Sequence, residues 1–448
     1  MSTKRIILVV SWVMLAAPIT VWCRQDVPGS GDALTLEEAI SLALRENHLV
    51  KNAKLGVGKS EDDLAATRTS RLPSMHIISL VAEQMVKQNL NIKDPLSGAL
   101  PGVGPFFTLS IDQKPTAIFA GLVLQPLSQQ YRIGLNIEQS RLARDLEQEN
   151  VRLVGQSTVD EVKQTYYGIL QTQSALDSVQ EAIRLYRELD RVTGDYVAQQ
   201  VSLKSDSLEV KTRLAKAEYQ ALSLTNQLAT QKEQLNNLLG RDVRAEFRVS
   251  AVPEISGFGL DLASARSRAL ELRPELREAR LKIKSAEVDR RVKKSEYIPD
   301  VSAAFSYMTL RNFANVIPKN FASIGISVKW EVFDWGRKRD QLAEKDKTIE
   351  QAKNGLHEAE SQVLIDVGDK FRKLQQTRQA LVVAQLTQET AREGLRVNTN
   401  KYKLTAALFS DVLQSEASLA EANHQYQQAL LGYWQAKAEF EKALGEEK

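Results

Sequence analysis

The chain contains two copies of one sequence plan, and this duplication limits what it can fold into. Residues 34–73 align with 260–299 without a gap, and the identities include Leu34, Ala39 and Pro73. A second gapless match aligns 162–240 with 367–445 and ends on the same Leu-Gly pair in both copies. We therefore predict two structural repeats, 34–240 and 260–445, joined by a linker at 241–259.

Each repeat predicts the same order of elements. A first helix (36–71 and 262–296) stops near a proline and is followed by two strands. These strands form hairpins within 74–127 (74–88 and 116–127) and 300–333 (300–310 and 321–333). A very long helix (132–194 and 337–399) and a return helix (206–239 and 410–444) complete the repeat. The first hairpin carries extra residues rich in Pro and Gly, which predict a loop.

The predicted long helices are far longer than those of ordinary globular proteins. In the first of them, apolar residues recur at steps of three and four, from Val159 through Tyr166 and Leu176 to Tyr186. This spacing is typical of coiled coils, with charged and amide side chains on the other faces. At 1.5 Å per residue, each helix would extend roughly 90 Å. The most general interpretation is a solvated coiled-coil rod.

One segment of the second hairpin has the opposite periodicity. In "SIGISVKWEVF" (323–333), every second residue is apolar, namely Ile324, Ile326, Val328, Trp330 and Val332. Small or charged residues occupy the positions between them. This pattern predicts a strand with one apolar and one polar face. The length and alternation fit a strand that spans an outer membrane, with the apolar face toward lipid. Strands of the first repeat alternate less cleanly.

Four strands per chain cannot close a barrel alone. Open strand edges in lipid would leave backbone hydrogen-bonding groups without partners. Closure therefore requires several copies of the chain, and three copies would supply twelve strands. The long helices would continue such a barrel as a tube. We thus expect a mainly α fold, with an α-barrel of long helices and a small membrane β-barrel shared between chains.

The N-terminus predicts export. Lys4 and Arg5 precede a short apolar run, which is typical of a signal peptide over residues 1–23. A membrane anchor is the alternative, but the apolar core is short for a span. Trp22 stands before the single cysteine, Cys23, where a lipoprotein signal has a small residue, and this favours plain cleavage over lipidation. The formal net charge of +3 provides no electrostatic argument for binding nucleic acid.

The sequence contains no pattern typical of an enzyme. Its four histidines (His48, His76, His357 and His424) lack the spacing of metal ligands. No glycine motif for a nucleotide follows a predicted strand. We therefore expect no catalytic residues, no cofactor and no metal.

The ordered set of motifs resembles the TolC-like outer-membrane efflux protein family. The resemblance depends on "LTLEEAISLAL", on "RLPSM" and "YIPDV" before the strands, on "VFDWGRKRDQ", and on "KYKLTAALFSDVLQSEASLAEA". It implies a homotrimer with a twelve-stranded outer-membrane barrel and a long periplasmic tunnel in a Gram-negative bacterium. Such proteins are passive exit ducts of tripartite efflux or type I secretion systems. Their partners are a periplasmic adaptor protein and an inner-membrane transporter.

The resemblance also assigns roles to the far ends of the long helices. The family's adaptor-docking helix tips match Gln199, Gln200 and Val201 in the first repeat, and Leu404, Thr405 and Ala406 in the second. The glycine usual in those turns is absent from both, which predicts a different backbone solution. Gate candidates near the tips are Arg396, Asn398, Asn400 and Asp411. Asp206 and Asp411 are also placed to cap the return helices.

A second class of function remains open from the sequence. A soluble periplasmic coiled-coil scaffold or adaptor without a pore would explain the signal and the long helices. It would not explain alternating strands in both repeats. The sequence does not identify the exported substrate.

Overall fold

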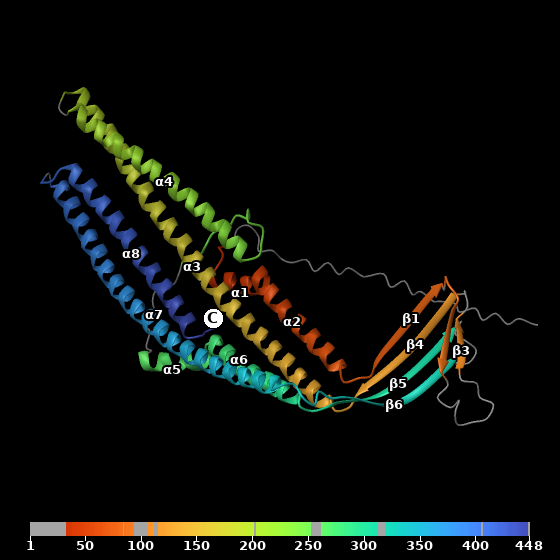
Figure 1. Cartoon of the computed structure of the whole chain (residues 1–448). Helices are drawn as coiled ribbons and strands as arrows, with labels where there is room; N and C mark the ends of the chain where they lie inside the picture. The colour runs from red at the N-terminus through yellow and green to blue at the C-terminus, as the bar shows by residue number, and fades with distance from the viewer. Residues whose placement is uncertain are drawn as a thin grey trace, which may run out of the picture.

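The computed structural model describes residues 33–83, 85–93, 106–111, 115–200, 203–251, 261–311, 319–404 and 406–446. The expected signal peptide, the tip residues Val201 and Thr405, and residues 252–259 of the expected linker lie outside these ranges. Figure 1 shows an elongated helical body. The sheet extends from one end of it, and the α3–α4 and α7–α8 turns lie at the other.

Eight helices form the body in the described residues, four from each repeat. They are α1 (Leu36–Glu46), α2 (His48–Thr69), α3 (Gln130–Ala198), α4 (Lys204–Leu238), α5 (Leu262–Leu272), α6 (Pro274–Ser295), α7 (Arg337–Lys403) and α8 (Phe409–Ala443). The long helices α3 and α7 reach 69 and 67 residues. No helix in the described part of the chain is both long enough and apolar enough to cross a membrane.

The first helix of each repeat is divided in two, and this corrects the prediction of continuous helices over 36–71 and 262–296. At Asn47 the backbone leaves helical geometry, and its side chain accepts hydrogen bonds from Leu49 and Val50 to cap α2. In the second repeat the break falls on Arg273, because Pro274 begins α6 and a residue before proline avoids helical geometry.

The residues at these two breaks form hydrogen bonds with the C-terminal ends of the return helices α4 and α8. The Asn47 amide donates to the Leu238 carbonyl at 2.8 Å, and the Arg273 guanidinium donates to the Ala443 carbonyl at 3.2 Å. Asn47 and Arg273 are equivalent positions of the repeats, as are Leu238 and Ala443. Different side chains therefore make the same contact in the two repeats.

Two equivalent cores lie beside these contacts. The first contains Ala39, Ala43 and Val162, and the second contains Ala265, Ala269 and Val367, all fully buried. The alanines let α1 and α5 approach the long helices closely, since they add no side chain beyond Cβ. The first core also takes in Leu431 and Ala438 of α8, and the partly buried Trp434 packs against both cores.

The helix α3 lies at the centre of the body. It contacts α1, α2 and α4 of its own repeat and α6 and α8 of the other. The helix α7 contacts only α5, α6 and α8 to a comparable extent among the described elements. Near the sheet, the neighbours therefore follow the order α2, α3, α6, α7, and toward the tips the order is α4, α3, α8, α7.

The main sheet contains four antiparallel strands in the order β1, β4, β5, β6, as the four-strand prediction expects. The strands are β1 (Ser74–Glu83), β4 (Pro115–Pro126), β5 (Asp300–Arg311) and β6 (Asn320–Lys329). Unpredicted strands β2 (Gln88–Lys93) and β3 (Phe106–Ile111) form a separate hairpin within the first repeat. This hairpin takes up parts of the segment whose Pro and Gly content predicted a loop.

The strand β6 ends at Lys329, four residues earlier than predicted. Trp330 and Val332 therefore lie beyond the strand rather than within it. Lys329 pairs with Asp300, so the next pair in the register would join Trp330 to Pro299. Because proline has no N–H to donate, the ladder ends there.

Gly240 provides a direct test of the packing at the first helix break. It has a φ of +66°, and a Cβ added there would lie 2.4 Å from the Glu46 carbonyl oxygen. We expect Gly240→Ala to destabilise the protein by about 2–4 kcal/mol through strain and overlap. Gly194→Ala is the control, since a Cβ at Gly194 meets nothing within 4 Å. This helical substitution should stabilise by about 0.5–1 kcal/mol. Thermal unfolding in detergent, followed by circular dichroism, measures both, and equal unfolding temperatures would contradict the assignment.

Candidate functional site

One face of the sheet is apolar across all four strands. The register places Ile324, Phe305, Val123 and Met75 in one row, and residues opposite each other across strands share a face. Alternate residues then continue the face: Ile326 and Val328 on β6, Val301 and Tyr307 on β5, Phe119 on β4, and Ile77 and Val81 on β1. Ile324 is 85% exposed and Ile326 is 71% exposed. In a single chain, this apolar face is uncovered.

The opposite face differs between the two repeats. On β5 and β6 its middle positions carry small residues, and Ser302 lies opposite Ser327, while Met308 pairs with Phe321 toward the far end. Ser306 and Ser323 share a hydrogen bond of 2.7 Å between their hydroxyls. On β1 and β4 the same face carries Ile78, Leu80, Ile118, Leu122 and Leu124. This explains why the first repeat alternates poorly in sequence: its strands are apolar on both faces.

Both outer edges of the sheet are unpaired within the described chain. β1 pairs only with β4, and β6 pairs only with β5. Each edge therefore presents a row of backbone N–H and C=O groups without strand partners. Both edges are therefore open to pairing with further strands.

An aromatic turn follows β6 at the boundary between sheet and helices. Phe333 and Trp335 stack edge to face with ring centroids 4.8 Å apart, and Trp335 is 89% exposed. The turn is held by Asp334, which accepts from the backbone N–H of Gly336 and of Lys338 at 3.1 and 2.9 Å. Trp335 has a φ of +56°, which is rare for a bulky residue. A large aromatic side chain is thereby exposed where the sheet meets the helices.

The helix tips show how the chain turns without glycine. α3 ends at Ala198, and Gln200 adopts a φ of +61°, the left-handed geometry that a glycine would otherwise supply. Gln199 before it keeps a negative φ of −82°. At the second tip, Leu404 is 76% exposed, and the Ala406 N–H donates to the Lys401 carbonyl at 2.8 Å. The remaining predicted tip residues, Val201 and Thr405, lie outside the described residues.

The gate candidates make local contacts within the chain. The Asn398 amide of α7 donates to the Ser415 hydroxyl of α8 at 2.6 Å, and Asp411 accepts from the Leu408 N–H at 3.0 Å. Asp411 therefore helps to cap α8 from the third helical position, while Leu408 is the N-cap residue, so the prediction that Asp411 is itself the N-cap was wrong. The equivalent prediction for Asp206 was also wrong, because α4 begins at Lys204 and Asp206 lies within it. Arg396 forms an exposed ion pair with Glu393, and Asn400 is exposed. Their role in a gate stays a prediction.

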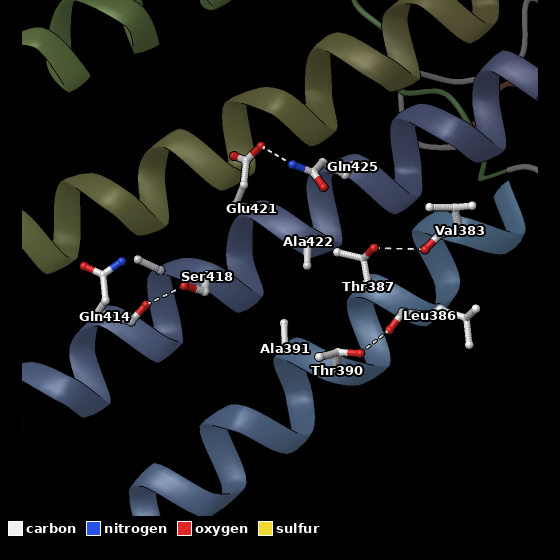
Figure 2. A pocket seen from close by; sticks show the side chains of 11 residues that line it. Val383, Leu386, Thr387, Thr390, Ala391, Gln414, Ser418, Glu421, Ala422 and Gln425 are labelled. Atoms are coloured by element: carbon white, nitrogen blue, oxygen red, sulfur yellow. Dashed lines mark hydrogen bonds between the residues drawn. The ribbon is translucent and has the colours of Figure 1, made fainter. Parts of the chain in front are cut away.

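A shallow groove between α7 and α8 was not foreseen from the sequence. It encloses about 660 Å³, and the small residues Ala391, Ser418 and Ala422 lie along it (Figure 2). The hydroxyls of Thr387, Thr390 and Ser418 donate to carbonyls one turn earlier in their own helices. At the positions of Ala391 and Ser418, the first repeat has the larger Tyr186 and Arg213. The comparison of the two repeats was the signal that could have revealed it.

Ion pairs connect the return helix α8 to both long helices. Lys163 pairs with Glu441, and Asp160 with Lys442, each at 2.9 Å across the contact between α3 and α8. On the other side of α8, Glu439 accepts from Lys370 and Lys373 of α7. Burial opposes ionisation of Glu439, but these hydrogen bonds outweigh it and hold the pKa of the carboxyl below its ordinary value. Its contribution to stability is therefore lost as the pH falls through that lowered value.

No group of three or more His, Cys, Asp or Glu side chains in the described ranges is arranged to hold a metal ion. The four histidines that the sequence analysis examined lie on four different elements: His48 on α2, His76 on β1, His357 on α7 and His424 on α8.

The model of the outer membrane efflux protein family matches residues 265–446, which is nearly the whole second repeat. No curated protein sequence matches the chain at a significant level. The resemblance inferred from the motifs is confirmed by this family match and by the solved structures below.

Solved outer-membrane channels share the fold of the described chain. The CmeC outer membrane channel of Campylobacter jejuni matches with a TM-score of 0.74 and 13% identity, over 92% of this chain and 85% of that one. The outer membrane protein VceC of Vibrio cholerae matches with a TM-score of 0.69 and 14% identity, over 92% of this chain and 96% of that one. The open-state MtrE channel of Neisseria gonorrhoeae matches with a TM-score of 0.69 and 17% identity, over 92% of this chain and 89% of that one. The fold is therefore that of the TolC-like outer-membrane channels.

The two adjacent glutamines at the first tip should respond in opposite ways to substitution by glycine. Gln200→Gly removes the strain of holding a residue with a Cβ in left-handed geometry, which is worth about 1–2 kcal/mol. It also makes the unfolded chain more flexible, which costs about 0.5–1 kcal/mol of stability. We expect a small net stabilisation. Gln199→Gly gains nothing from its negative φ and should destabilise by about 0.5–1 kcal/mol. Thermal unfolding of both variants measures the difference, and a shift of the same sign in both would refute the left-handed turn.

Proposed function

We propose that the protein is an outer-membrane exit duct, a passive channel for substrates that an inner-membrane transporter delivers through a periplasmic adaptor. The observation that carries this proposal is the four-stranded sheet, which has an uncovered apolar face and two unpaired edges. The family match over the second repeat and the shared fold support the same function. In a soluble scaffold, this uncovered apolar face of the sheet would be exposed to water, which is unfavourable.

Lipid is the medium that suits the apolar face. In hydrocarbon, the side chains of Ile324, Ile326 and Val328 would be solvated, while unpaired strand edges would be costly. Further copies of the chain would pair β6 of one with β1 of the next. Three copies would give a closed barrel of twelve strands, lined on the second-repeat strands by Ser302, Ser306 and Ser327. Trp335 and Phe333 would then lie at the membrane boundary, where aromatic residues gather.

The helical body would continue the channel on the periplasmic side. The α3–α4 and α7–α8 turns lie at the end farthest from the sheet (Figure 1), and this is where an adaptor would dock. The docking residues we propose are Gln199, Gln200, Val201, Leu404, Thr405 and Ala406. Near the same end, Arg396, Asn398, Asn400 and Asp411 are proposed to line or close the opening.

Cell fractionation tests the proposal against the alternative of a soluble periplasmic scaffold. An exit duct should be recovered with outer membranes and should leave them only with detergent, as a complex of three chains by light scattering. Recovery as a monomer in the soluble periplasmic fraction would refute the duct and support the scaffold.

The two faces of β6 should differ in their tolerance of charge. Ile326→Arg places a cation on the face assigned to lipid and should cost about 2–4 kcal/mol near the membrane midplane. Ser327→Arg, one residue along and on the face assigned to the lumen, should cost much less. The amount of trimer in outer membranes measures both variants. Equal loss in the two would mean that the faces are assigned wrongly.

A further inference from the structure

The lumen face of the proposed duct carries almost no charge in the described strands. This face consists of the even-numbered residues of β1, β4 and β5 and the odd-numbered residues of β6, because residues paired across strands share a face. Among these residues, only Asp300 and Lys329 have a permanently charged side chain. The other acidic and basic residues of the four strands, Glu83 and Arg311, lie on the opposite face. Neutral side chains therefore line most of the lumen face.

The two charged residues lie together at the helical end of the lumen face. Asp300 and Lys329 are opposite each other in the register of β5 and β6. Arg132 of α3 also pairs with Asp300 at 2.8 Å. Side chains of these types ordinarily keep their charge between pH 5 and 8. A charge on the lumen face that depends on pH in this range must therefore come from elsewhere.

His76 is the one titratable side chain on the lumen face beyond that end, within the described strands. Its level in the sheet runs from Leu122 on β4 through Ser306 on β5 to Ser323 on β6, and none of these residues is titratable. Six residues along β5 separate Ser306 from Asp300, which is about 20 Å. In a closed ring, β6 of the next copy would flank β1, and the lumen face of that strand has one charged residue, at its helical end.

The duplication indicates that the fold does not require a histidine at this position. His76 is the third residue after Pro73, and the third residue after Pro299 is Ser302. In a single chain, the side chain of His76 is exposed rather than packed in a core. Histidine is the side chain whose charge ordinarily changes between pH 5 and 8. His76 therefore adds what the equivalent serine does not, a charge on the lumen face that depends on pH.

We propose that His76 is a specificity-determining residue of the duct and sets its preference between anionic and cationic cargo. With neutral histidines, the lumen face carries no charge at this level. When the histidines are protonated, three copies of the chain would place three positive charges around one level of the lumen. Rings of charged side chains attract ions of the opposite sign and repel ions of the same sign. The inference rests on the proposed three-chain duct, and it adds that the barrel favours anions in acid.

The ion selectivity of single channels tests this inference. Trimers of the full chain are placed in planar lipid bilayers, and the reversal potential is measured under a gradient of potassium chloride at pH 8 and at pH 5. We expect the ratio of chloride to potassium permeability to rise at pH 5 by about twofold more in the unaltered chain than in His76→Gln. At pH 8 the two ratios should be equal, because glutamine and neutral histidine are both uncharged. The titratable groups of the helical body are common to both proteins, so their response to pH cancels in this comparison.

Two further variants separate the charge of His76 from other effects of its substitution. His48→Gln, on α2 in the helical body, should respond to pH like the unaltered chain. Ile78→His in the His76→Gln background returns a histidine to the lumen face, two residues along β1. It should restore the response to pH, because the face of the strand decides whether the charge reaches the lumen.

Loss of the response in His76→Gln and its return with Ile78→His would support the inference. A response of the same size in the unaltered chain and in His76→Gln would overturn the inference and leave the proposed duct standing. A failure of Ile78→His to restore the response would have the same consequence. If the unaltered chain gives no trimer, or its trimer forms no conducting channel, the inference and the proposed duct are both wrong.

Discussion

The need to pair every backbone group of an exposed strand edge governs this structure. A sheet of four strands has two edges, and here both are open beside an apolar face. In water, exposure of the apolar face would be unfavourable. In lipid, the unpaired N–H and C=O groups of the strand edges would be unfavourable. In the proposed duct, a closed ring of strands from several chains would pair the edges, and lipid would cover the apolar face. The helical body follows the same logic, since its outermost helices on either side also expose apolar residues.

The body is held in shape at its middle rather than at its ends. There the return helices finish against the breaks at Asn47 and Arg273, and two cores rich in alanine and aromatic residues lie beside them. Toward the tips the helices depend on pairwise coiled-coil packing, and toward the sheet they are bridged by scattered ion pairs such as Arg290 with Asp346. The stable middle positions the sheet at one end and the tips at the other.

The sequence predicted the elements well where periodicity and duplication agreed, and poorly where a single residue decided. The long helices and the four-stranded sheet follow from runs that are many residues long. The division of the first helices does not, because it depends on the side chain of Asn47 in one repeat and on Pro274 in the other. The end of β6 depends on Pro299, which immediately precedes β5 and becomes relevant only through the register. The groove between α7 and α8 is visible only when Ala391 and Ser418 are compared with Tyr186 and Arg213.

Duplication also explains why equivalent contacts differ in chemistry. The contact of α3 with α6 and α8 joins the two repeats within one chain, so its formation does not cost the freedom of a separate molecule. Charged side chains take part in this contact, as when the buried Asp160 of α3 pairs with the half-exposed Lys442 of α8 at 2.9 Å. At the equivalent positions, α7 carries the exposed apolar residues Ile365, Val383 and Leu386, and no helix of the first repeat covers them extensively in the described chain. The two long helices thus share one plan but carry polar residues where α3 meets the other repeat and apolar residues at the same positions of α7.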